Sequence, residues 1–458
     1  MSNGLRRWAS AIVLALTACR GGPPVEADLA IAHVDVVPMT ADTVLENRTV
    51  LVRNGRIAEI VGADAVRVSE GTPTIDGTGR YLVPGLVDGH AHVRARGVLD
   101  LFLSQGFTTV RNMHGGLGDP LVWARAIRAG EIVGPTLVNA SPALAWDTPG
   151  FTLPGRQPIT SLDTLEAYVR EIADSGYASI KILGFPRDAF DALMAAAEGV
   201  GLPVTGHPPI TRTGDPHQDL TIDEVLGSGM TVVEHVGELI TYGLGPDPSD
   251  TVASADLARR VAASGVAVTT TISTTLTIAS ALELDSAYVT PEMYDRAFRH
   301  AGEEEAEFLY RMPQIWRENG FTRIDPEFLA LFVRQLHAAR VPLMVGTDAH
   351  TALEVAGESA VSEMLHLHAF GLSPFESLKA LTATPAAVLG ESGEWGTVEV
   401  GARADLVLLD ANPLADPTAV RSLVGVVVGG QWLDRPRLDE MRTRAEEGRL
   451  ACRRARCD

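Results

Sequence analysis

Short apolar runs alternate with amphipathic stretches through the middle of the chain. The runs have the length of buried strands, and the stretches between them, such as SLDTLEAYVREIADSG, have helical periodicity and often end in glycine. The runs are LVPGLVD, TTVRNM, PTLVNAS, SIKIL, PVTGH, TVVEHV, VAVTTTIS and PLMVGTD. This alternation predicts an α/β fold in which residues 82–394 form a parallel (β/α)₈ TIM barrel.

The two ends of the chain alternate apolar and polar residues instead, as strands with one solvent-facing side do. Residues 28–81 contain two such runs on either side of Asn54-Gly55, which is a strong signal for a two-residue hairpin turn. Residues 395–436 have a similar pattern, in WGTVEVG, ADLVLLD and VGVVVGGQWL. We therefore expect the two segments to join into one small sheet domain, although they lie at opposite ends of the sequence.

The stretch from Ile278 to Gly320 differs from the other connections of the predicted barrel. It is helical in pattern and rich in glutamate, and it is too long for a simple connection. Two interpretations are open: the stretch caps the pocket at the strand ends as a lid, or it is an excursion over the surface.

The first residues have the pattern of an export signal. Two arginines precede an apolar run that ends in Leu16-Thr17-Ala18-Cys19, so residues 1–18 are predicted to be a signal peptide. The tetrapeptide resembles the lipobox of bacterial lipoproteins, which predicts lipidation of Cys19 and a tether over residues 19–27. The alternative is ordinary secretory cleavage with Cys19 incidental. The expected location is the periplasm or cell envelope, with membrane attachment through lipid alone, because no other apolar run could span a bilayer.

Composition and charge exclude several kinds of partner. The 458 residues are 46% hydrophobic and 21% charged, as in a globular protein. The net charge of −20 argues against nucleic acid and against direct binding to an anionic membrane surface. The C-terminal tail, residues 437–458, carries Cys452 and Cys457, which could form a disulfide in an oxidising compartment. The sequence is compatible with a homo-oligomer as well as with a monomer.

Residues with metal-binding side chains lie at the ends of the predicted strands. His90 and His92 are two residues apart, so on a strand both imidazoles point to the same face and can reach one metal ion. Such a pair alone could be incidental in a buried strand. Further candidates stand at the ends of later strands, which favours a metal site; they are Lys181, His207, His235 and Asp348.

Lys181 is unusual because the chain has 38 basic residues and only Lys181 and Lys379 are lysine. A buried lysine can lose its proton, whereas arginine cannot. A neutral amine can add carbon dioxide to become a carbamate, an anionic ligand with two oxygens that is able to bridge two metals. The alternative is a lysine paired with a neighbouring carboxylate. Its place inside the apolar run SIKIL favours the carbamate.

The chain resembles the amidohydrolase superfamily, and most closely its imidazolonepropionase-like and prolidase-like members. The matching pieces span almost all of residues 28–436 and are VPGLVDGHAH, GFTTVRNMHGG, SIKIL, LPVTGH, VVEHV, VGTDAH, ALTATPAAVLG and GTVEVGARADLVLLDANPL. The resemblance implies a (β/α)₈ barrel beside a small β-sandwich built from both chain ends. It also implies two divalent ions, expected to be Zn²⁺, one bound by His90, His92, Lys181 and Asp348, the other by carboxylated Lys181, His207 and His235.

A metal site of this kind implies a hydrolase acting on an amide or peptide-like C–N bond of a small molecule or short peptide. A metal-bridging hydroxide would attack the carbonyl, and Asp348 would carry the proton to the leaving nitrogen. The alternatives are a cyclic amidase or a lactonase with the same metals, or a catalytically silent, surface-tethered binding protein. Lys181 and His207 are only 26 residues apart, where many prolidase-like members have a longer loop, which weakens assignment as an Xaa-Pro-type dipeptidase.

The sequence indicates substrate-binding residues less clearly than metal ligands. His114 and Arg111 follow or end a predicted strand and could bind a substrate carboxylate. For Arg111 a structural ion pair is the competing interpretation. Tyr242 lies in a predicted loop after the sixth strand and is a further candidate.

Overall fold

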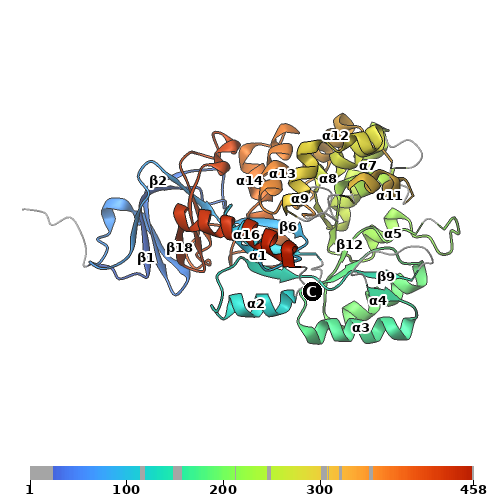
Figure 1. Cartoon of the computed structure of the whole chain (residues 1–458), viewed down its shortest axis with the longest axis horizontal. Coiled ribbons are helices and arrows are strands. Elements are labelled where there is room, and N and C mark those ends of the chain that lie inside the picture. Colours follow the sequence, from blue (N-terminus) through green and yellow to red (C-terminus); the bar gives the residue numbers. More distant parts are fainter. Residues whose placement is uncertain are drawn as a thin grey trace, which may run out of the picture.

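The computed structural model describes residues 24–113, 119–147, 157–211, 213–244, 249–300, 307, 309–318, 322–349 and 354–455. Strands from the two chain ends lie together at one end of the molecule, and parallel strands surrounded by helices form the rest (Figure 1). The predicted signal peptide and Cys19 fall outside the described residues. No helix among the residues described is both long and apolar enough to cross a bilayer.

The sheet at one end has the order β18-β17-β16-β5-β1-β2-β3, with β4 beside β1. β5 lies between the two halves, because it pairs with β1 on one side and with β16 on the other. Asn54 and Gly55, with φ of 51° and 72°, make the predicted hairpin turn between β2 and β3. The strands are β1 (Leu29–Val36), β2 (Leu45–Arg53), β3 (Arg56–Gly62), β4 (Thr74–Asp76), β5 (Tyr81–Pro84), β16 (Leu406–Leu409), β17 (Leu423–Val428) and β18 (Gln431–Asp434).

All the strand pairs in the middle of the chain are parallel, as the alternation of strands and helices predicted. They form two sheets, β6-β7-β8 and β10-β9-β11-β12-β13-β14-β15. Isolated parallel bridges, Ala91 with Ala349 and Ala140 with Ser179, connect both edges of the three-stranded sheet to the chain of the seven-stranded sheet, after β15 and just before β11. The strands are β6 (Leu86–Ala91), β7 (Phe107–Asn112), β8 (Thr136–Asn139), β9 (Leu144–Trp146), β10 (Gln157–Ile159), β11 (Ile180–Ile182), β12 (Val204–Gly206), β13 (Val232–Val233), β14 (Ala267–Thr269) and β15 (Leu343–Met344).

Local sequence signals set the bounds of the helices that cover these strands. In α3 the Ser161 hydroxyl accepts a hydrogen bond from the Thr164 amide, and Gly176 ends the helix with φ of 86°. The helices are α1 (Gly97–Leu103), α2 (Pro120–Arg128), α3 (Leu162–Ser175), α4 (Arg187–Val200), α5 (Ile222–Gly227), α6 (Val236–Gly243), α7 (Thr251–Ser264), α8 (Ile272–Leu284), α9 (Pro291–His300), α11 (Met312–Glu318), α12 (Pro326–Ala338), α13 (Glu358–Ala369), α14 (Pro374–Ala380), α15 (Ala383–Val388) and α16 (Arg435–Ala455).

The described part of residues 278–320 is helical, as predicted. It contains the end of α8, the 3₁₀ turns η2 (Asp285–Tyr288) and η3 (Leu309–Arg311), α9 and α11. These elements share a small apolar cluster of their own, formed by Ala281, Tyr288, Met312 and Trp316. The choice between a lid and a surface excursion stays a prediction.

Most of the segment predicted as a C-terminal tail, residues 437–458, belongs to the helix α16. Leu438, Met441 and Ala445 of α16 are buried, since they recur on one face of the helix. Arg444 pairs with Asp100 of α1 at 2.8 Å, and Figure 1 shows α16 near α1. Cys452 belongs to α16, whereas Cys457 lies outside the described residues.

Candidate metal centre

The carboxyl ends of the parallel strands bring together all six predicted metal ligands. His90 belongs to β6 and Lys181 to β11, and the other four follow directly or closely after a strand: His92 after β6, His207 after β12, His235 after β13 and Asp348 after β15. Five of the six are buried, and His207 is half-buried. This is the edge at which parallel α/β enzymes place their reactive residues.

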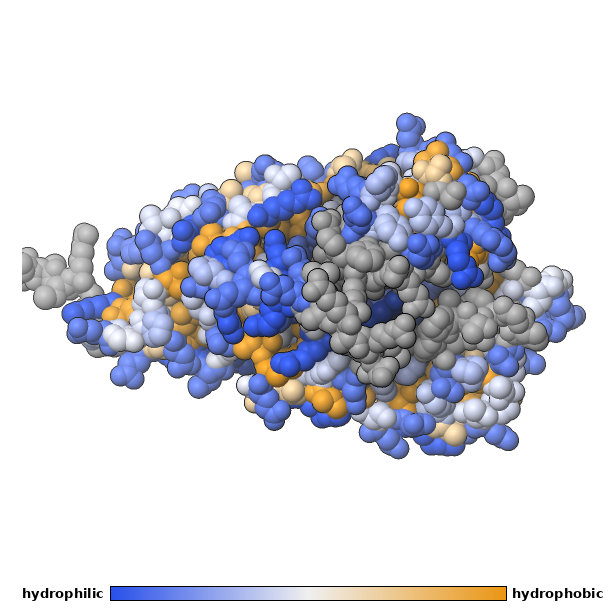
Figure 2. All heavy atoms as spheres, viewed as in Figure 1, coloured by the Kyte–Doolittle hydropathy of each residue, from blue (hydrophilic) through white to orange (hydrophobic). Residues whose placement is uncertain are grey.

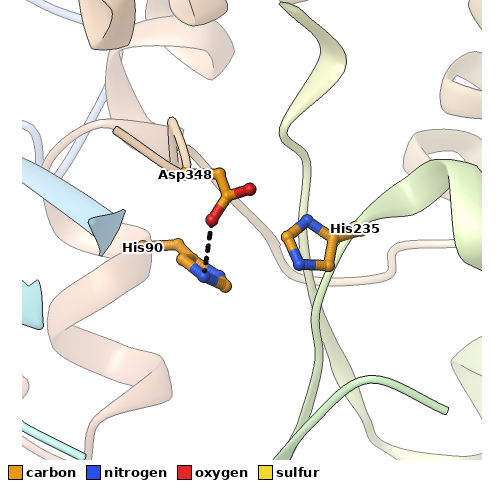
Figure 3. A group of neighbouring side chains, drawn as sticks. All are labelled: His90, His235 and Asp348. Atoms are coloured by element: carbon orange, nitrogen blue, oxygen red, sulfur yellow. Dashed lines mark ion pairs between the residues drawn. The ribbon is translucent and has the colours of Figure 1, made fainter. Parts of the chain in front are cut away.

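Asp348 lies between His90 and His92, the two histidines at the end of β6. Its Oδ1 is 2.7 Å from Nε2 of His92 and 3.3 Å from Nε2 of His90, the contact drawn in Figure 3. Burial opposes ionisation of Asp348, but hydrogen bonds from the two histidines hold the pKa of its carboxyl well below the ordinary value. Asp348 is therefore an anion at neutral pH.

The other three candidate ligands lie next to His90, His92 and Asp348. Ligand atoms of His90, His235 and Asp348 all lie within 4.8 Å of one another, and Figure 3 shows the three side chains facing a common space. The ring of His207 is centred 4.6 Å from that of His235. The Lys181 Nζ lies 3.4 Å from Nε2 of His90. The six side chains thus form one continuous cluster.

The outer nitrogens of three histidines are held by other side chains. Nδ1 of His90 lies 2.8 Å from Oε2 of Glu234, Nδ1 of His207 lies 2.7 Å from Oε1 of Glu238, and Nδ1 of His235 lies 3.0 Å from Oγ1 of Thr271. A carboxylate only accepts hydrogen bonds, so Nδ1 of both His90 and His207 carries the hydrogen. When these rings are neutral, as a metal ligand must be, their Nε2 atoms are left as acceptors.

The donor set fits a divalent cation. Nε2 of His90 lies 3.3 Å from Oδ1 of Asp348, and in the neutral ring both atoms are acceptors that a positive ion can hold together. Burial, and then the charge of Lys181, lower the pKa of His92 to about 4, so its imidazole is neutral as a metal ligand must be. Histidines that bind metals commonly donate their second nitrogen to a carboxylate, as His90 and His207 do here.

Glu234 is the centre of a buried network that the sequence did not reveal. Its Oε1 accepts hydrogen bonds from Nη1 of Arg111 and from Oγ1 of Thr205, both at 2.7 Å. Burial opposes ionisation, but the charge of Arg111 and that of His90 hold the pKa of Glu234 well below its ordinary value. Glu234 therefore holds His90 as a fully ionised acceptor.

Asp88 connects the first and last parallel strands behind His90. Its Oδ1 accepts hydrogen bonds from the backbone amides of His90 and Thr347, and its Oδ2 accepts one from Oγ1 of Thr347. Burial raises the pKa of Asp88 to about 7. These bonds fix the position of Asp348, the next residue after Thr347, relative to His90.

Two of the candidate ligands have a backbone conformation that side chains rarely adopt. His235 has φ of 66° and Asp348 has φ of 59°, both in the left-handed region. Thr271, which contacts His235, has φ of 39°. Conformations of this kind carry a strain energy and cluster at functional sites, where the surroundings hold them.

Lys181 is buried with an amine that is easily deprotonated. Burial lowers the pKa of its amine to about 8, although the charges of Asp348 and Glu234 oppose this. No carboxylate among the described residues forms an ion pair with it, so the alternative of a paired lysine finds no support there. Its backbone amide donates to Oγ of Ser141 at 3.1 Å, which anchors the strand.

Residues 81–433 match the model of the amidohydrolase family. The chain belongs to that family. An adenine deaminase of Paracoccus denitrificans is 31% identical over 174 residues, which are 36% of this chain and 28% of the deaminase. An imidazolonepropionase of Maricaulis maris is 32% identical over 103 residues, 22% of this chain and 26% of that protein. The chain thus aligns with about a quarter of the length of either relative.

A solved structure from Bifidobacterium longum, assigned as a prolidase, has the same fold. It superposes with a TM-score of 0.64 at 24% identity, over 91% of this chain and 98% of that chain. Together with the family match, these similarities confirm the predicted resemblance to imidazolonepropionase-like and prolidase-like members.

The structure places the three predicted substrate-binding residues of this amidohydrolase differently from one another. Arg111 is 2% exposed and binds Glu234, Thr205 and the carbonyl of Gly89, so it forms the structural ion pair that was the competing interpretation. Tyr242 is half-buried, and it lies on α6 rather than in a loop. His114 lies outside the described residues.

The surface of the amidohydrolase is hollowed near the parallel strands. Figure 2 shows a hollow on this face, in the region between the labels of β6 and β12 in Figure 1, and the atoms at its floor are hydrophilic. His207, the half-buried member of the cluster, has a side chain that is 28% exposed. A small molecule could therefore reach the cluster on the side of His207.

Proposed function

We propose that this amidohydrolase uses two divalent metal ions to cleave an amide or peptide-like C–N bond of a small molecule or short peptide. The observation that carries the proposal is the pair of carboxylates, Glu234 and Glu238, behind His90 and His207. They turn the acceptor nitrogens of both imidazoles away from the glutamates, and Asp348 adds an anion beside them. A cluster of acceptors with these anchors is typical of a metal centre.

The parallel strands are proposed to form a closed (β/α)₈ barrel, with a β-sandwich built from both chain ends. The bridges from Ala91 to Ala349 and from Ala140 to Ser179 support closure, because they connect both edges of the three-stranded sheet to the other parallel strands. A barrel would place all six ligands around the mouth of one cavity, since side chains at the carboxyl ends of its strands converge there.

The six side chains divide into two ligand sets. His90, His92 and Asp348, which touch one another, would hold one ion, and His207 and His235, whose rings are adjacent, would hold the other. A carbamate on Lys181 would belong to both. Imidazole nitrogens and carboxylate oxygens suit zinc. When bound, such ions would acidify a water molecule and polarise the carbonyl of the substrate.

Asp348 is proposed to move the proton. Its carboxylate contacts His90 and His92 through Oδ1, so Oδ2 stays available to take a proton from the attacking water. Its rigid position suits transfer of that proton to the leaving nitrogen, which would otherwise depart as an unstable anion. The backbone hydrogen bond from Asp348 to the carbonyl of His90, 2.8 Å long, supports such a fixed position.

A substrate screen with metal analysis tests this function. The zinc-loaded protein is incubated with N-acyl amino acids, dipeptides, cyclic amides and lactones, and release of amine or acid is followed. The proposal expects turnover of an open-chain amide and two zinc ions per chain. Preference for cyclic amides or lactones would contradict it. A metal content near zero after supplementation would favour a catalytically silent binding protein.

We also propose that the mature protein is an exported lipoprotein of the cell envelope. The sequence Leu16-Thr17-Ala18-Cys19 after a short apolar run supports this location, and the residues up to 27 would tether the first strand to the lipid. The enzyme would then meet substrates outside the cytoplasm.

A further inference from the structure

The side chain of Thr271, the N-cap residue of α8, is turned away from the helix that it precedes. A threonine in this position ordinarily accepts a hydrogen bond from an amide of the first turn, and its backbone is extended. In this chain Oγ1 of Thr271 lies 3.0 Å from Nδ1 of His235 and caps no amide in the described part of α8. The backbone of Thr271 is left-handed, with φ of 39° and ψ of 47°. The hydroxyl is therefore directed to the candidate metal centre instead of the helix.

Glu363 of α13 supplies the acceptors for the first amides of α8. Its side chain is completely buried, and Oε2 accepts a hydrogen bond of 2.8 Å from the amide of Ile272 while Oε1 accepts one from the amide of Ser273. Oε2 also accepts a hydrogen bond of 3.0 Å from Oγ1 of Thr270. Figure 1 shows α13 beside α8, so a carboxylate from a neighbouring helix caps α8. Glu363 thus holds the residues on both sides of Thr271.

These contacts account for the strained backbone of Thr271. A β-branched residue with φ of 39° is a rare outlier, and such a conformation persists only where its surroundings impose it. Thr270 and Ile272 are bonded to the same oxygen of Glu363, which confines the chain between them to a tight turn. Without this carboxylate, Thr271 could return to the ordinary N-cap conformation and place its hydroxyl on the amides of α8.

His235 depends on this arrangement more than the other two anchored histidines do. Nδ1 of His90 and Nδ1 of His207 each lie against a buried glutamate. Nδ1 of His235 lies against the hydroxyl of Thr271, which can donate as well as accept and which rotates unless it is held. In this case the buried carboxylate, that of Glu363, stands one residue further back.

We propose that Glu363 is a positioning residue of the metal centre, because it holds Thr271 so that the hydroxyl orients the imidazole of His235 for metal binding. This inference rests on the proposed metal centre, since it assigns a function to a residue behind one of the ligands. No hydrogen bond or ion pair among the described residues joins Glu363 to a candidate ligand, so Glu363 acts through Thr271. Loss of a partner that orients a ligand usually weakens metal binding about 10- to 100-fold.

Binding of cobalt(II) tests the inference without any substrate. Metal-free full-length protein is titrated with cobalt, and the visible absorption is recorded because the d–d bands depend on the number and geometry of the ligands. In Glu363→Gln one carbonyl oxygen cannot serve both amides, so an NH₂ group faces either Ile272 or Ser273. We expect at least one cobalt ion to bind about tenfold more weakly than in the wild type, with altered absorption bands.

Asp325→Asn is the matched control. Oδ1 of Asp325 also accepts hydrogen bonds from two amides at the beginning of a helix, those of Glu327 and Phe328 in α12. Hydrogen bonds do not connect these residues with Thr271 in the part of the chain that the structure describes. We expect this variant to keep the cobalt affinity and the spectrum of the wild type. If Glu363→Gln does not fold, Glu363→Asp serves in its place, since it keeps the charge but withdraws the carboxylate by one methylene and should weaken cobalt binding in the same direction.

Thr271→Val distinguishes an effect through the hydroxyl from general destabilisation. Valine has the shape of threonine and the same branched Cβ, but it lacks the hydroxyl. If Glu363 acts through this hydroxyl, the losses of cobalt affinity in Glu363→Gln and Thr271→Val are not additive, and the double variant binds cobalt about as weakly as the weaker single variant. Additive losses would overturn the inference, as would an equal loss in Asp325→Asn.

The cobalt titration and an amide hydrolysis assay have separate consequences. Wild-type affinity and an unchanged spectrum in Glu363→Gln would overturn the positioning role even if the protein cleaves amides. Cobalt affinity that depends on Glu363 and Thr271 together, in a protein that cleaves no amide, would support the positioning role while contradicting amide hydrolysis.

Discussion

Nδ1 of His90 lies 2.8 Å from Oε2 of Glu234, and both side chains are completely buried. Because a carboxylate fixes the hydrogen on Nδ1, Glu234 determines which nitrogen of His90 is free to bind a metal. The Glu234→Gln variant can present an NH₂ group to His90 in place of the carboxylate. We expect zinc affinity to fall by about 10- to 100-fold, the usual effect of losing such a partner.

A chelator competition measures this affinity, and circular dichroism checks that the variant is folded. Glu394→Gln is a matched control, since Glu394 also pairs with an arginine, Arg56, but at the surface with a side chain that is 58% exposed. Equal zinc affinity in Glu234→Gln and wild type would show that His90 does not depend on this carboxylate.

Arg111 should contribute to stability rather than to substrate binding. Its Nη1 contacts Glu234 at 2.7 Å with both side chains buried, so Arg111→Leu leaves an uncompensated charge in the interior. Loss of one partner of a buried ion pair costs about 3–5 kcal/mol. Urea unfolding of the metal-free protein should show this as a lower midpoint. The double variant Arg111→Leu/Glu234→Gln should recover part of the loss.

Arg56→Leu is the control for that prediction. It removes an arginine from an exposed ion pair, which is worth about 0–1 kcal/mol. A similar midpoint for Arg111→Leu and Arg56→Leu would mean that the buried pair contributes no more than a surface one.

The parallel strands and the clustering of the six candidate side chains could be predicted because the chemistry lies in short, regular patterns. An apolar run that ends in histidine or aspartate indicates a buried strand with a polar end, and β6, β12, β13 and β15 all follow this pattern. The exact strand lengths could not be predicted from the sequence. β13 and β15 have only two residues each, and their pairing depends on neighbours distant in sequence.

The role of Glu234 was hidden for a physical reason. Neighbouring residues of a strand point to opposite faces, so Glu234 would be expected to face away from His235 and from the site. The strand ends at Val233, and His235 has φ of 66°, which breaks the alternation and lets both side chains serve one cluster. The helix α16 was missed because only a narrow apolar stripe, including Leu438 and Met441, stands among many charged residues.

Asp348→Asn should remove the proposed proton carrier while preserving the local backbone. Asparagine tolerates left-handed φ better than most residues, so the 59° of Asp348 need not change. General acid–base catalysis contributes about 10²- to 10⁴-fold, and we expect kcat to fall by that factor on the best substrate of the screen. An unchanged thermal midpoint would confirm that the fold is intact. A variant with more than a tenth of the wild-type kcat would contradict the assigned role.

Cys19→Ser tests the proposed lipid anchor in cells that express the full-length chain. Without the thiol no lipid can be attached, so the protein should move from the sedimented membrane fraction to the soluble fraction. Cys452→Ser is the matched control, because Cys452 belongs to α16 and should leave the distribution unchanged. Wild-type protein that is already soluble after sedimentation of membranes would contradict the anchor.

Lys181→Arg gives the most direct test of the carbamate. Arginine keeps the positive charge and the length of the side chain but cannot become a neutral amine, so no carbamate can form. We expect zinc content to fall from two ions per chain to one at most, with loss of activity. Lys379→Arg changes the other lysine of the chain, which is exposed, and should change neither. Full activity of Lys181→Arg would exclude the carbamate.

The carbamate also predicts a dependence on pH. Burial lowers the pKa of the Lys181 amine to about 8, so the reactive neutral form increases about tenfold per pH unit below 8 and changes little above it. Metal-free protein reconstituted with zinc at a constant concentration of dissolved carbon dioxide should regain activity at a rate with this profile. An ordinary, exposed lysine would keep the rate rising to about pH 10, because only then would its amine be neutral. A rate independent of carbon dioxide would contradict the carbamate.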